Sequence, residues 1–384
     1  MRFRGYPRRD GRAGTRNHLL ILSVTGLTGP AARRIGASLR GSIVVGTPYG
    51  SGLLGADAAA QERCLAGLAA HPNAGAVLVV GGDAPLVERV AGAAAASGRP
   101  VEGLTIDGCG HDLLALADRG IRAGLRLAKA IAGAARVELG PDQLCLGLEC
   151  GRSDPSSGLV ANPVVGLLVD RVVDGGGTAI LGETTEWLGA EHRLAARAVD
   201  AATGRAIREA ADRREAMAVV AGLDLTGTNP SATNIAAGLS SIEEKSLGAV
   251  AKAGSRPIRG LLDYGAVPPG SGLWVMDAPA YAPESVTGFT AAGANLVLFT
   301  TGVGNAYGSI LAPTVKISAN PETCARLGEQ LDVDLSGVFT GRDRPERAAD
   351  ELLALVCSVA SGRRVTAEIL GETDEVLARF GPAL

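Results

Sequence analysis

Two short polar loops carry the side chains of this sequence that are best suited to chemistry. The first loop is 151–154 (GRSD) and the second is 183–186 (ETTE), with His192 a short way further along the chain. Each loop directly follows an apolar run of strand length, at 145–150 and 178–183. A carboxylate at the end of a buried strand, with a histidine nearby, suits a general base or a metal ligand.

The spacing of the two runs places both loops at one edge of a sheet. A helix-length apolar segment, 163–173, separates the runs, and such a strand–helix–strand unit has parallel strands. Open α/β sheets bind ligands at the carboxyl ends of their strands. We therefore interpret Glu183 or Glu186 as a base or metal ligand, and Asp154 and His192 as further catalytic candidates.

Each of these candidates also has a simpler explanation. Asp154 precedes a proline and suits a turn or a helix N-cap. Carboxylates such as Glu183 and Glu186 are common at helix N-termini. His192 by itself does not decide between a catalytic role and none.

Lysine is scarce, and its positions are therefore informative. Of the 37 basic residues only four are lysines, at positions 129, 245, 252 and 316, which leaves 37 − 4 = 33 arginines. The lysines are thus enriched where an ammonium group is needed. Lys245 follows two glutamates and precedes small or apolar residues, so at least one of these charges is expected to point inward. Lys245 is then a candidate acid or base, whereas the alternative is a solvated helix face.

The order of elements predicts the α/β class, with two domains built on mainly parallel sheets flanked by helices. A polar segment at 137–143 marks the boundary, so the domains are expected at 1–139 and 140–384. In the second domain the pattern predicts one long helix at 187–220, a polar loop at 226–234, a helix at 242–253 and strands at 260–264, 273–276 and 295–301.

Composition excludes several classes of function. The net charge of −3 and the lack of long basic runs argue against nucleic acid as a partner. No apolar run reaches the ~18 residues of a membrane span, and the amino terminus lacks the apolar core of a signal peptide. The six cysteines are scattered, which favours reduced thiols in the cytoplasm. No nucleotide is expected, because neither GxGxxG with a following acid nor GxxxxGK[ST] occurs. A homo-oligomer is the default assembly.

Five segments resemble one known family, that of the altronate/galactarate dehydratases. They are 5–18 (GYPRRDGRAGTRNH), 149–163 (ECGRSDPSSGLVANP), 182–192 (GETTEWLGAEH), 229–254 (NPSATNIAAGLSSIEEKSLGAVAKAG) and 294–305 (ANLVLFTTGVGN). The resemblance covers nearly the whole chain in order. It implies the second and C-terminal catalytic domains of these enzymes, without their small N-terminal module of the SAF type. The chain also resembles the large subunit of the two-subunit sulfolactate sulfo-lyases, which implies a separate small SAF-type subunit as a partner.

The resemblance implies a lyase that removes a leaving group from C3 of a small 2-hydroxy acid. A base takes the C2 proton, a divalent metal (Fe²⁺ or Mn²⁺) or a cationic group stabilises the enediolate, and a 2-keto acid results. The catalytic candidates are then Glu183, Glu186, His192, Lys245 and Asp154, with the metal ligands unassigned. The candidate substrate-binding residues are Arg16, Asn17, Arg152, Ser153, Asn162, Asn234, Thr300 and Thr301.

The chain departs from the family pattern at several positions. Leu27, Ser51 and Ala84 stand where many members carry cysteines, and Ile235 stands where many carry lysine. The leading hypothesis is dehydration of a sugar-acid-like substrate, and the alternative is release of sulfite. A non-catalytic ligand-binding paralogue is the third hypothesis.

Overall fold

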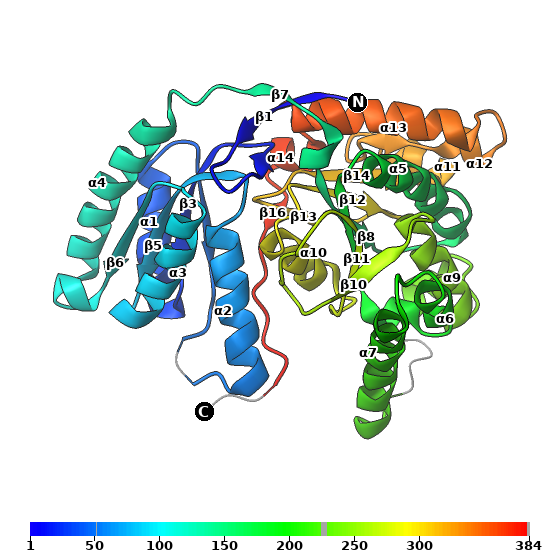
Figure 1. The fold of residues 1–384 in the computed structure, drawn as a ribbon, viewed down its shortest axis with the longest axis horizontal. Helices are drawn as coiled ribbons and strands as arrows, with labels where there is room; N and C mark the ends of the chain where they lie inside the picture. Colours follow the sequence, from blue (N-terminus) through cyan, green and yellow to red (C-terminus); the bar gives the residue numbers. More distant parts are fainter. Residues whose placement is uncertain (51, 224–228, 382–384) are drawn as a thin grey trace.

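The computed structural model describes residues 1–50, 52–223 and 229–381. Its two large sheets, of seven and four parallel strands, are each flanked by helices and lie side by side (Figure 1). This confirms the predicted α/β class. Ser51 and residues 224–228 of the predicted polar loop lie outside the described residues.

The first sheet has four parallel strands in the order β4-β3-β5-β6. They are β3 (His18–Ser23), β4 (Ser42–Gly46), β5 (Ala74–Gly81) and β6 (Val101–Thr105). Alternate residues of β3 enter different cores: Ile21 packs with α1 (Gly29–Ser38) and α4 (Leu113–Ile131). Leu22 packs on the opposite face with α2 (Gly55–Ala69) and α3 (Ala84–Ala96). Both faces are therefore covered, as in other parallel sheets.

The second sheet has seven parallel strands in the order β10-β11-β9-β8-β12-β14-β15. They are β8 (Cys145–Cys150), β9 (Thr178–Leu181), β10 (Ile258–Leu262), β11 (Gly272–Met276), β12 (Leu296–Thr300), β14 (Thr314–Ser318) and β15 (Val333–Asp334). Helices α5 (Asn162–Asp174) and α13 (Pro345–Ala360) cover one face. Helix α10 (Ala282–Ala291) covers the other and packs closely on α2 of the first domain, between the two sheets.

Short strands and the carboxyl-terminal segment tie the two halves together. Strand β1 (Phe3–Pro7) pairs with β2 (Ala13–Gly14) and β7 (Val137–Leu139), and β13 (Gly308–Ser309) pairs with β16 (Thr373–Asp374). After β16 the chain returns to the first domain, the red segment of Figure 1. There the backbone N–H groups of Phe380 and Gly381 donate to the Asp57 carboxylate. The domain division at residue 139 stays a prediction.

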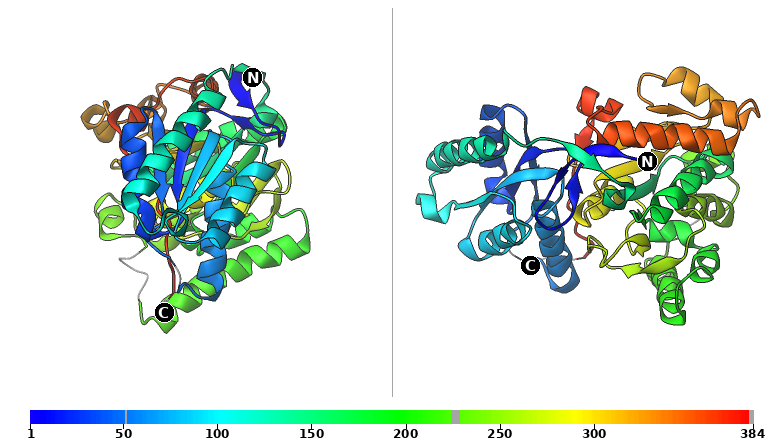
Figure 2. Two further views of the ribbon diagram at one scale, coloured as in Figure 1. Left: turned by 90° about the vertical axis from the view of Figure 1, so that its left-hand side faces the viewer. Right: turned by 45° about the horizontal axis from the view of Figure 1, so that its top comes forward.

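The prediction of a single long helix at 187–220 was wrong. The segment forms a 3₁₀ turn (Thr184–Trp187), a short helix α6 (Glu191–Ala195) and a separate helix α7 (Ala201–Val220). Gly189 takes a positive φ of 83°, which ends the first turn. Asp200 begins α7 as its N-cap, since its carboxylate accepts a hydrogen bond from the Thr203 N–H. Helix α7 projects from the body of the molecule (Figures 1 and 2).

The remaining helices are short. They are α8 (Ala232–Ala236), α9 (Ile242–Val250), α11 (Pro321–Arg326), α12 (Ser336–Phe339) and α14 (Thr366–Leu370). Helix α9 continues into a 3₁₀ turn, Ala251–Ala253, close to the predicted range. Among the described helices none is long and apolar enough to cross a membrane.

Candidate active site at the strand ends

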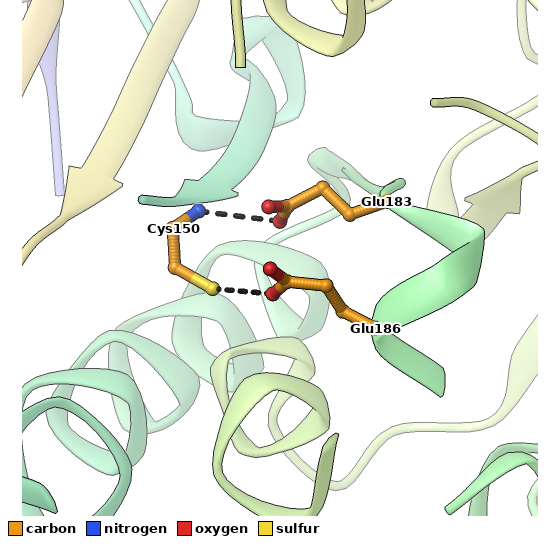
Figure 3. A group of neighbouring side chains, drawn as sticks. All are labelled: Cys150, Glu183 and Glu186. Atoms are coloured by element: carbon orange, nitrogen blue, oxygen red, sulfur yellow. Dashed lines mark hydrogen bonds between the residues drawn. The ribbon is translucent and has the colours of Figure 1, made fainter. Parts of the chain in front are cut away.

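The two polar loops come together at adjacent strand ends, as predicted. Strands β8 and β9 are neighbours in the sheet. The Cys150 backbone N–H donates to Glu183 Oε2 at 3.2 Å, and the Cys150 thiol donates to Glu186 Oε2 at 3.0 Å (Figure 3). All three side chains are buried. This edge of the sheet therefore holds two carboxyl groups away from bulk water.

Two lysines supply the opposite charge. Lys252 Nζ lies 2.6 Å from Glu183 Oε2 and 3.0 Å from Cys150 Sγ, and its side chain is 1% exposed. Lys245 Nζ lies 2.7 Å from Glu186 Oε1 and 2.5 Å from Asn229 Oδ1. The lysines are seven residues apart, on α9 and the turn that follows it, so they lie near one face of the helix. Each glutamate is thus paired with its own ammonium group.

Glu149 completes this group from the opposite face of the sheet. Its side chain faces α10, whereas that of its neighbour Cys150 faces α5, because strand residues alternate. Ser285 of α10 donates a hydrogen bond to Glu149 Oε2. Burial, and then the charge of Glu183, raise the pKa of Glu149 well above its usual value. Glu149 Oε1 and Glu183 Oε1 are buried without a hydrogen-bond partner among the described residues. We call Glu149, Cys150, Glu183, Glu186, Lys245 and Lys252 the strand-end cluster.

The two paired glutamates differ in acidity. Burial, and then the charge of Glu186, raise the pKa of Glu183 to about 7 despite the Lys252 ammonium. Burial also acts on Glu186, but Lys245 and Lys252 outweigh it and hold the pKa of Glu186 below its usual value. Glu183 can therefore exchange a proton near neutral pH, whereas Glu186 stays ionised. A base whose pKa lies near the working pH is the efficient kind.

The other ionisable groups of the cluster keep their protons. Burial would lower the pKa of Lys252, but the Cys150 sulfur and the carboxylates raise it well above its usual value. Burial likewise acts on Lys245, and the Glu186 carboxylate raises its pKa. Burial, with the charges of Glu183 and Glu186, raises the pKa of the Cys150 thiol. The cluster thus combines two ammonium groups, a neutral thiol and a neutral acid.

The backbone at both loops takes unusual conformations. Arg152 and Glu183 have positive φ angles of 52° and 61° although neither is a glycine. Such a conformation costs ~1–2 kcal/mol for an ordinary residue. In the second loop, the Thr184 hydroxyl donates to Asp277 and the Thr184 N–H donates to the Ala278 carbonyl, which holds the turn. Strain of this kind is typical of functional sites.

Several predicted site residues hold the neighbouring loops in place. Asp154 Oδ1 accepts from the Ser156 hydroxyl and the Ser157 N–H, and its Oδ2 accepts from Asn320. These are the contacts of a turn residue, which was the alternative explanation for Asp154. The buried hydroxyl of Ser153 has no hydrogen-bond partner in the described part of the chain.

The predicted amide and hydroxyl groups also make internal hydrogen bonds. Asn162 accepts from the Thr300 hydroxyl and donates to the Gly248 carbonyl. Asn234 donates to the Ser153 carbonyl, and the Thr301 hydroxyl accepts from the Gly304 N–H. These residues connect the loops after β8 and β12 with α8 and α9. These residues therefore hold the loops around the cluster in place through internal hydrogen bonds.

Arg16, Asn17 and His192 do not join the cluster. The Arg16 guanidinium binds both carboxylate oxygens of Glu368 at 2.7 Å, and Asn17 lies between Arg8 and the Ile131 carbonyl. His192 is exposed on α6. Arg152 is also exposed, and it makes no ion pair with any described residue.

The sequence did not single out Glu149, Cys150 and Lys252 as site residues. Lys252 is one of four lysines, and its seven-residue spacing from Lys245 was a usable signal. Glu149 is a charged residue inside an apolar strand, and such residues are seldom fully buried without a partner. Both signals indicate buried charged side chains, but neither shows which residues pair with Glu149 or Lys252.

Three side chains of the cluster offer ligand atoms for a metal. Cys150, Glu183 and Glu186 bring one such atom each within 4.8 Å of one another. Metal–ligand bonds of ~2.0–2.3 Å would place a dication against the Lys252 ammonium, which already binds Glu183 and Cys150. Both lysines are held in their charged form. With Lys252 in this place, the cluster does not fit a divalent metal.

A cavity of about 530 Å³ lies beside the cluster. Asn229, the partner of Lys245, forms part of its wall together with residues of α7 and α9. The wall also carries four acidic side chains, Glu191, Asp212, Glu215 and Glu243. Asn229 is the link between the cavity and the cluster, since no residue of the strand-end cluster is among those that line the cavity, and the acidic wall does not favour an anion.

Comparison with known proteins covers both halves of the chain. The family model for the D-galactarate/altronate dehydratase C-terminal domain matches residues 141–383. The model for the second domain of D-galactarate dehydratase/altronate hydrolase matches residues 5–133.

Individual relatives extend over nearly the whole chain. The (2R)-sulfolactate sulfo-lyase subunit beta of Chromohalobacter salexigens is 37% identical over 381 residues, which is 98% of this chain and 97% of that protein. The altronate dehydratases of Escherichia coli and Bacillus subtilis are 31% and 30% identical, covering 94% and 95% of this chain but 74% and 75% of those proteins. The chain therefore belongs to the D-galactarate/altronate dehydratase family.

Proposed function

We propose that the chain is a lyase that catalyses β-elimination from a small 2-hydroxy acid and forms a 2-keto acid. The observation that carries this proposal is Glu183, a buried carboxyl group with a pKa of about 7 that is paired with Lys252 at a strand end. Relatives named as dehydratases and as a sulfo-lyase subunit support the reaction class.

The reaction begins with transfer of the C2 proton of the substrate to the Glu183 carboxylate. The electron pair of the C2–H bond moves toward the substrate carboxylate and forms an enediolate, whose extra negative charge needs a cation nearby. Lys245 donates a hydrogen bond to Asn229, which lines the cavity, and we assign it this role. Glu186 holds Lys245 in place through its 2.7 Å ion pair.

Elimination then transfers the electron pair into a C2–C3 double bond as the leaving group departs from C3. A hydroxyl group needs a proton to leave as water, and Lys245 can supply it. Sulfite leaves with the C–S electron pair and needs no proton. The enol that remains rearranges to a 2-keto acid in either case.

The identity of the leaving group separates two candidate substrates. A sugar acid would lose water, as the names of the altronate and galactarate dehydratases indicate. A 2-hydroxy-3-sulfo acid would lose sulfite, and one observation favours it: the sulfo-lyase subunit is 37% identical to this chain, whereas the two altronate dehydratases are 31% and 30% identical.

The substrate anion is best placed on the side of the first loop. Arg152 is exposed there, and the unpartnered Ser153 hydroxyl lies beside it. We propose that Arg152 holds the carboxylate or sulfonate and that Ser153, Asn162, Asn234, Thr300 and Thr301 shape this wall. Arg16 and Asn17 remain predictions from the resemblance, and Asp154 and His192 remain predictions from the residue pattern; none of the four has contacts that support a direct role.

The remaining proposals concern partners and cofactors. The word "subunit" in the name of the sulfo-lyase relative supports a separate partner chain, which we propose to be a small SAF-type subunit. A divalent metal, Fe²⁺ or Mn²⁺, remains a prediction from the resemblance, although the strand-end cluster does not fit it. A cytoplasmic location and a homo-oligomer are proposed from composition and default assembly.

A substrate panel tests the proposed function. The purified chain is incubated with sulfolactate, altronate and galactarate, each with and without the small SAF-type subunit, and 2-keto acid and free sulfite are measured. Formation of 2-keto acid with stoichiometric sulfite identifies the sulfo-lyase, and 2-keto acid without sulfite identifies the dehydratase. If none of these acids is turned over under any condition, the lyase proposal fails.

A further inference from the structure

We propose that the Lys252 ammonium takes the place that a metal ion would hold in the strand-end cluster, so that the cation of this site is part of the protein. Lys252 is then a positioning residue that keeps the Glu183 carboxylate and the Cys150 thiol in place. The positioning role of Lys252 rests on the proposed function, because it assumes that Glu183 is the catalytic base. The exclusion of a metal ion rests on the contacts of Lys252 alone.

The contacts of Lys252 carry the first step. Its Nζ is within 3.0 Å of one atom on each of two of the three candidate ligand residues, Glu183 Oε2 and Cys150 Sγ. The third candidate residue, Glu186, receives hydrogen bonds from the Cys150 thiol and from Lys245. Each residue that could bind a metal thus has a hydrogen-bonding partner inside the cluster, and Glu183 Oε1 is the one carboxylate oxygen of Glu183 and Glu186 that lacks a partner among the described residues.

The balance of charge carries the second step. Lys245 and Lys252 supply two positive charges, and Glu183 and Glu186 supply two negative charges when both are ionised. The Cys150 thiol donates a hydrogen bond to Glu186. The two ion pairs, Lys245 with Glu186 and Lys252 with Glu183, therefore balance each other's charge. A dication would add two uncompensated charges to a fully buried site, which is strongly unfavourable.

The packing around Lys252 carries the third step. The side chain is 1% exposed and extends from the turn that follows α9, which packs on α5. The helix carbonyl of Ala251 lies against Gly166 of α5, where a Cβ atom would come within 2.4 Å of it. Such a close approach leaves little room for Lys252 to move aside for a metal ion.

Binding of Co²⁺ alone tests the inference, because a bond between a thiolate and Co²⁺ gives a near-ultraviolet charge-transfer band. The wild-type chain and the Cys150→Ser variant, both reduced and free of metal, are titrated with Co²⁺. A band that the variant lacks is due to the Cys150 thiol and not to another cysteine. We expect no band that depends on Cys150 in the wild type. We expect such a band in Lys252→Met, where the ammonium is gone and its volume is kept.

Two results would overturn the inference. One is a wild-type band that disappears in Cys150→Ser, which would show that the cation binds despite Lys252. The other is no Cys150-dependent band in a folded Lys252→Met or Lys252→Gln variant, which would show that Lys252 is not what excludes the ion. Neither readout involves turnover, so failure of this inference is distinguishable from failure of the lyase proposal.

Discussion

At the scale of single residues, the central feature is the contrast between Glu183 and Glu186. Both are buried, and both are paired with a lysine. Burial, and then the charge of Glu186, raise the pKa of Glu183 to about 7, whereas the lysines hold the pKa of Glu186 below its usual value despite burial. Two carboxyl groups whose pKa values are pushed apart divide the work of proton transfer and charge stabilisation.

The raised pKa of Glu183 predicts the pH dependence of the rate. A carboxyl group with a raised pKa stays protonated below that pKa, and a protonated base cannot accept the C2 proton. We expect kcat/KM to fall tenfold per pH unit as the pH drops below about 7. A kcat/KM profile of the wild-type chain measures this, and a profile that stays flat from pH 7 down to pH 5 would exclude Glu183 as the base.

Lys245 is predicted to act through its charge. Lys245→Met should lower kcat by at least ~100-fold, the scale of an acid–base or charge-stabilising group, and Lys245→Arg should recover part of the rate. Lys129→Met is the matched control, because Lys129 is exposed on α4. Equal losses in Lys245→Met and Lys129→Met would remove Lys245 from the mechanism.

At the scale of elements, the adjacent strands β8 and β9 and helix α9 with its following turn hold the cluster. Helix α14 and the segment before β3 are joined separately by Arg16. Its guanidinium binds Glu368 and three backbone carbonyl groups, those of Thr15, Val359 and Arg363. These hydrogen bonds give Arg16 a structural role. To bind substrate as predicted, its guanidinium would have to give up some of them.

Arg16→Met is expected to destabilise the chain by ~3–5 kcal/mol, since it leaves the partly buried Glu368 carboxylate unpaired. Arg16 lowers the pKa of Glu368 against the effect of burial. The stabilisation is therefore present above the ordinary pKa of 4.5 and lost as the pH falls through the lowered value. Denaturant unfolding at pH 7 and pH 3 measures both effects. An unchanged free energy of unfolding, with a raised KM, would favour substrate binding instead.

At the scale of the whole molecule, one hydrophobic core spans the two domains. Leu65 of α2, Phe289 of α10 and Leu377 of the carboxyl-terminal segment belong to the same buried cluster. Unfolding of either domain would expose apolar surface of the other, so a single cooperative transition is expected.

Leu377→Ala tests this coupling. Loss of a buried leucine side chain costs ~2–5 kcal/mol, and the whole thermal transition should shift to lower temperature as one step. Leu370→Ala is the control, because Leu370 is exposed. A Leu377→Ala variant with two separate transitions would show that the domains unfold independently.

The parallel sheets and the meeting of the two polar loops were predictable from sequence, because apolar runs and their spacing determine which strands are neighbours. Lys245 was predictable as an inward charge from its small neighbours. The burial of Glu149 was not predictable, since it depends on packing between distant segments. The helix break at 187–200 was missed, although Gly189 and Asp200 are local signals for it. The roles expected of Arg16 and Asp154 could not be weighed until their partners Glu368 and Asn320 were known.

The rate of Glu183→Gln tests most directly whether the strand-end cluster is the catalytic centre. Glutamine keeps the shape and the hydrogen-bonding oxygen but cannot accept the C2 proton, and Glu329→Gln is the control at an exposed position. With the substrate that the panel identifies, Glu183→Gln should form 2-keto acid at least ~100-fold more slowly, while Glu329→Gln keeps the wild-type rate. Wild-type turnover by a folded Glu183→Gln variant would contradict the assignment.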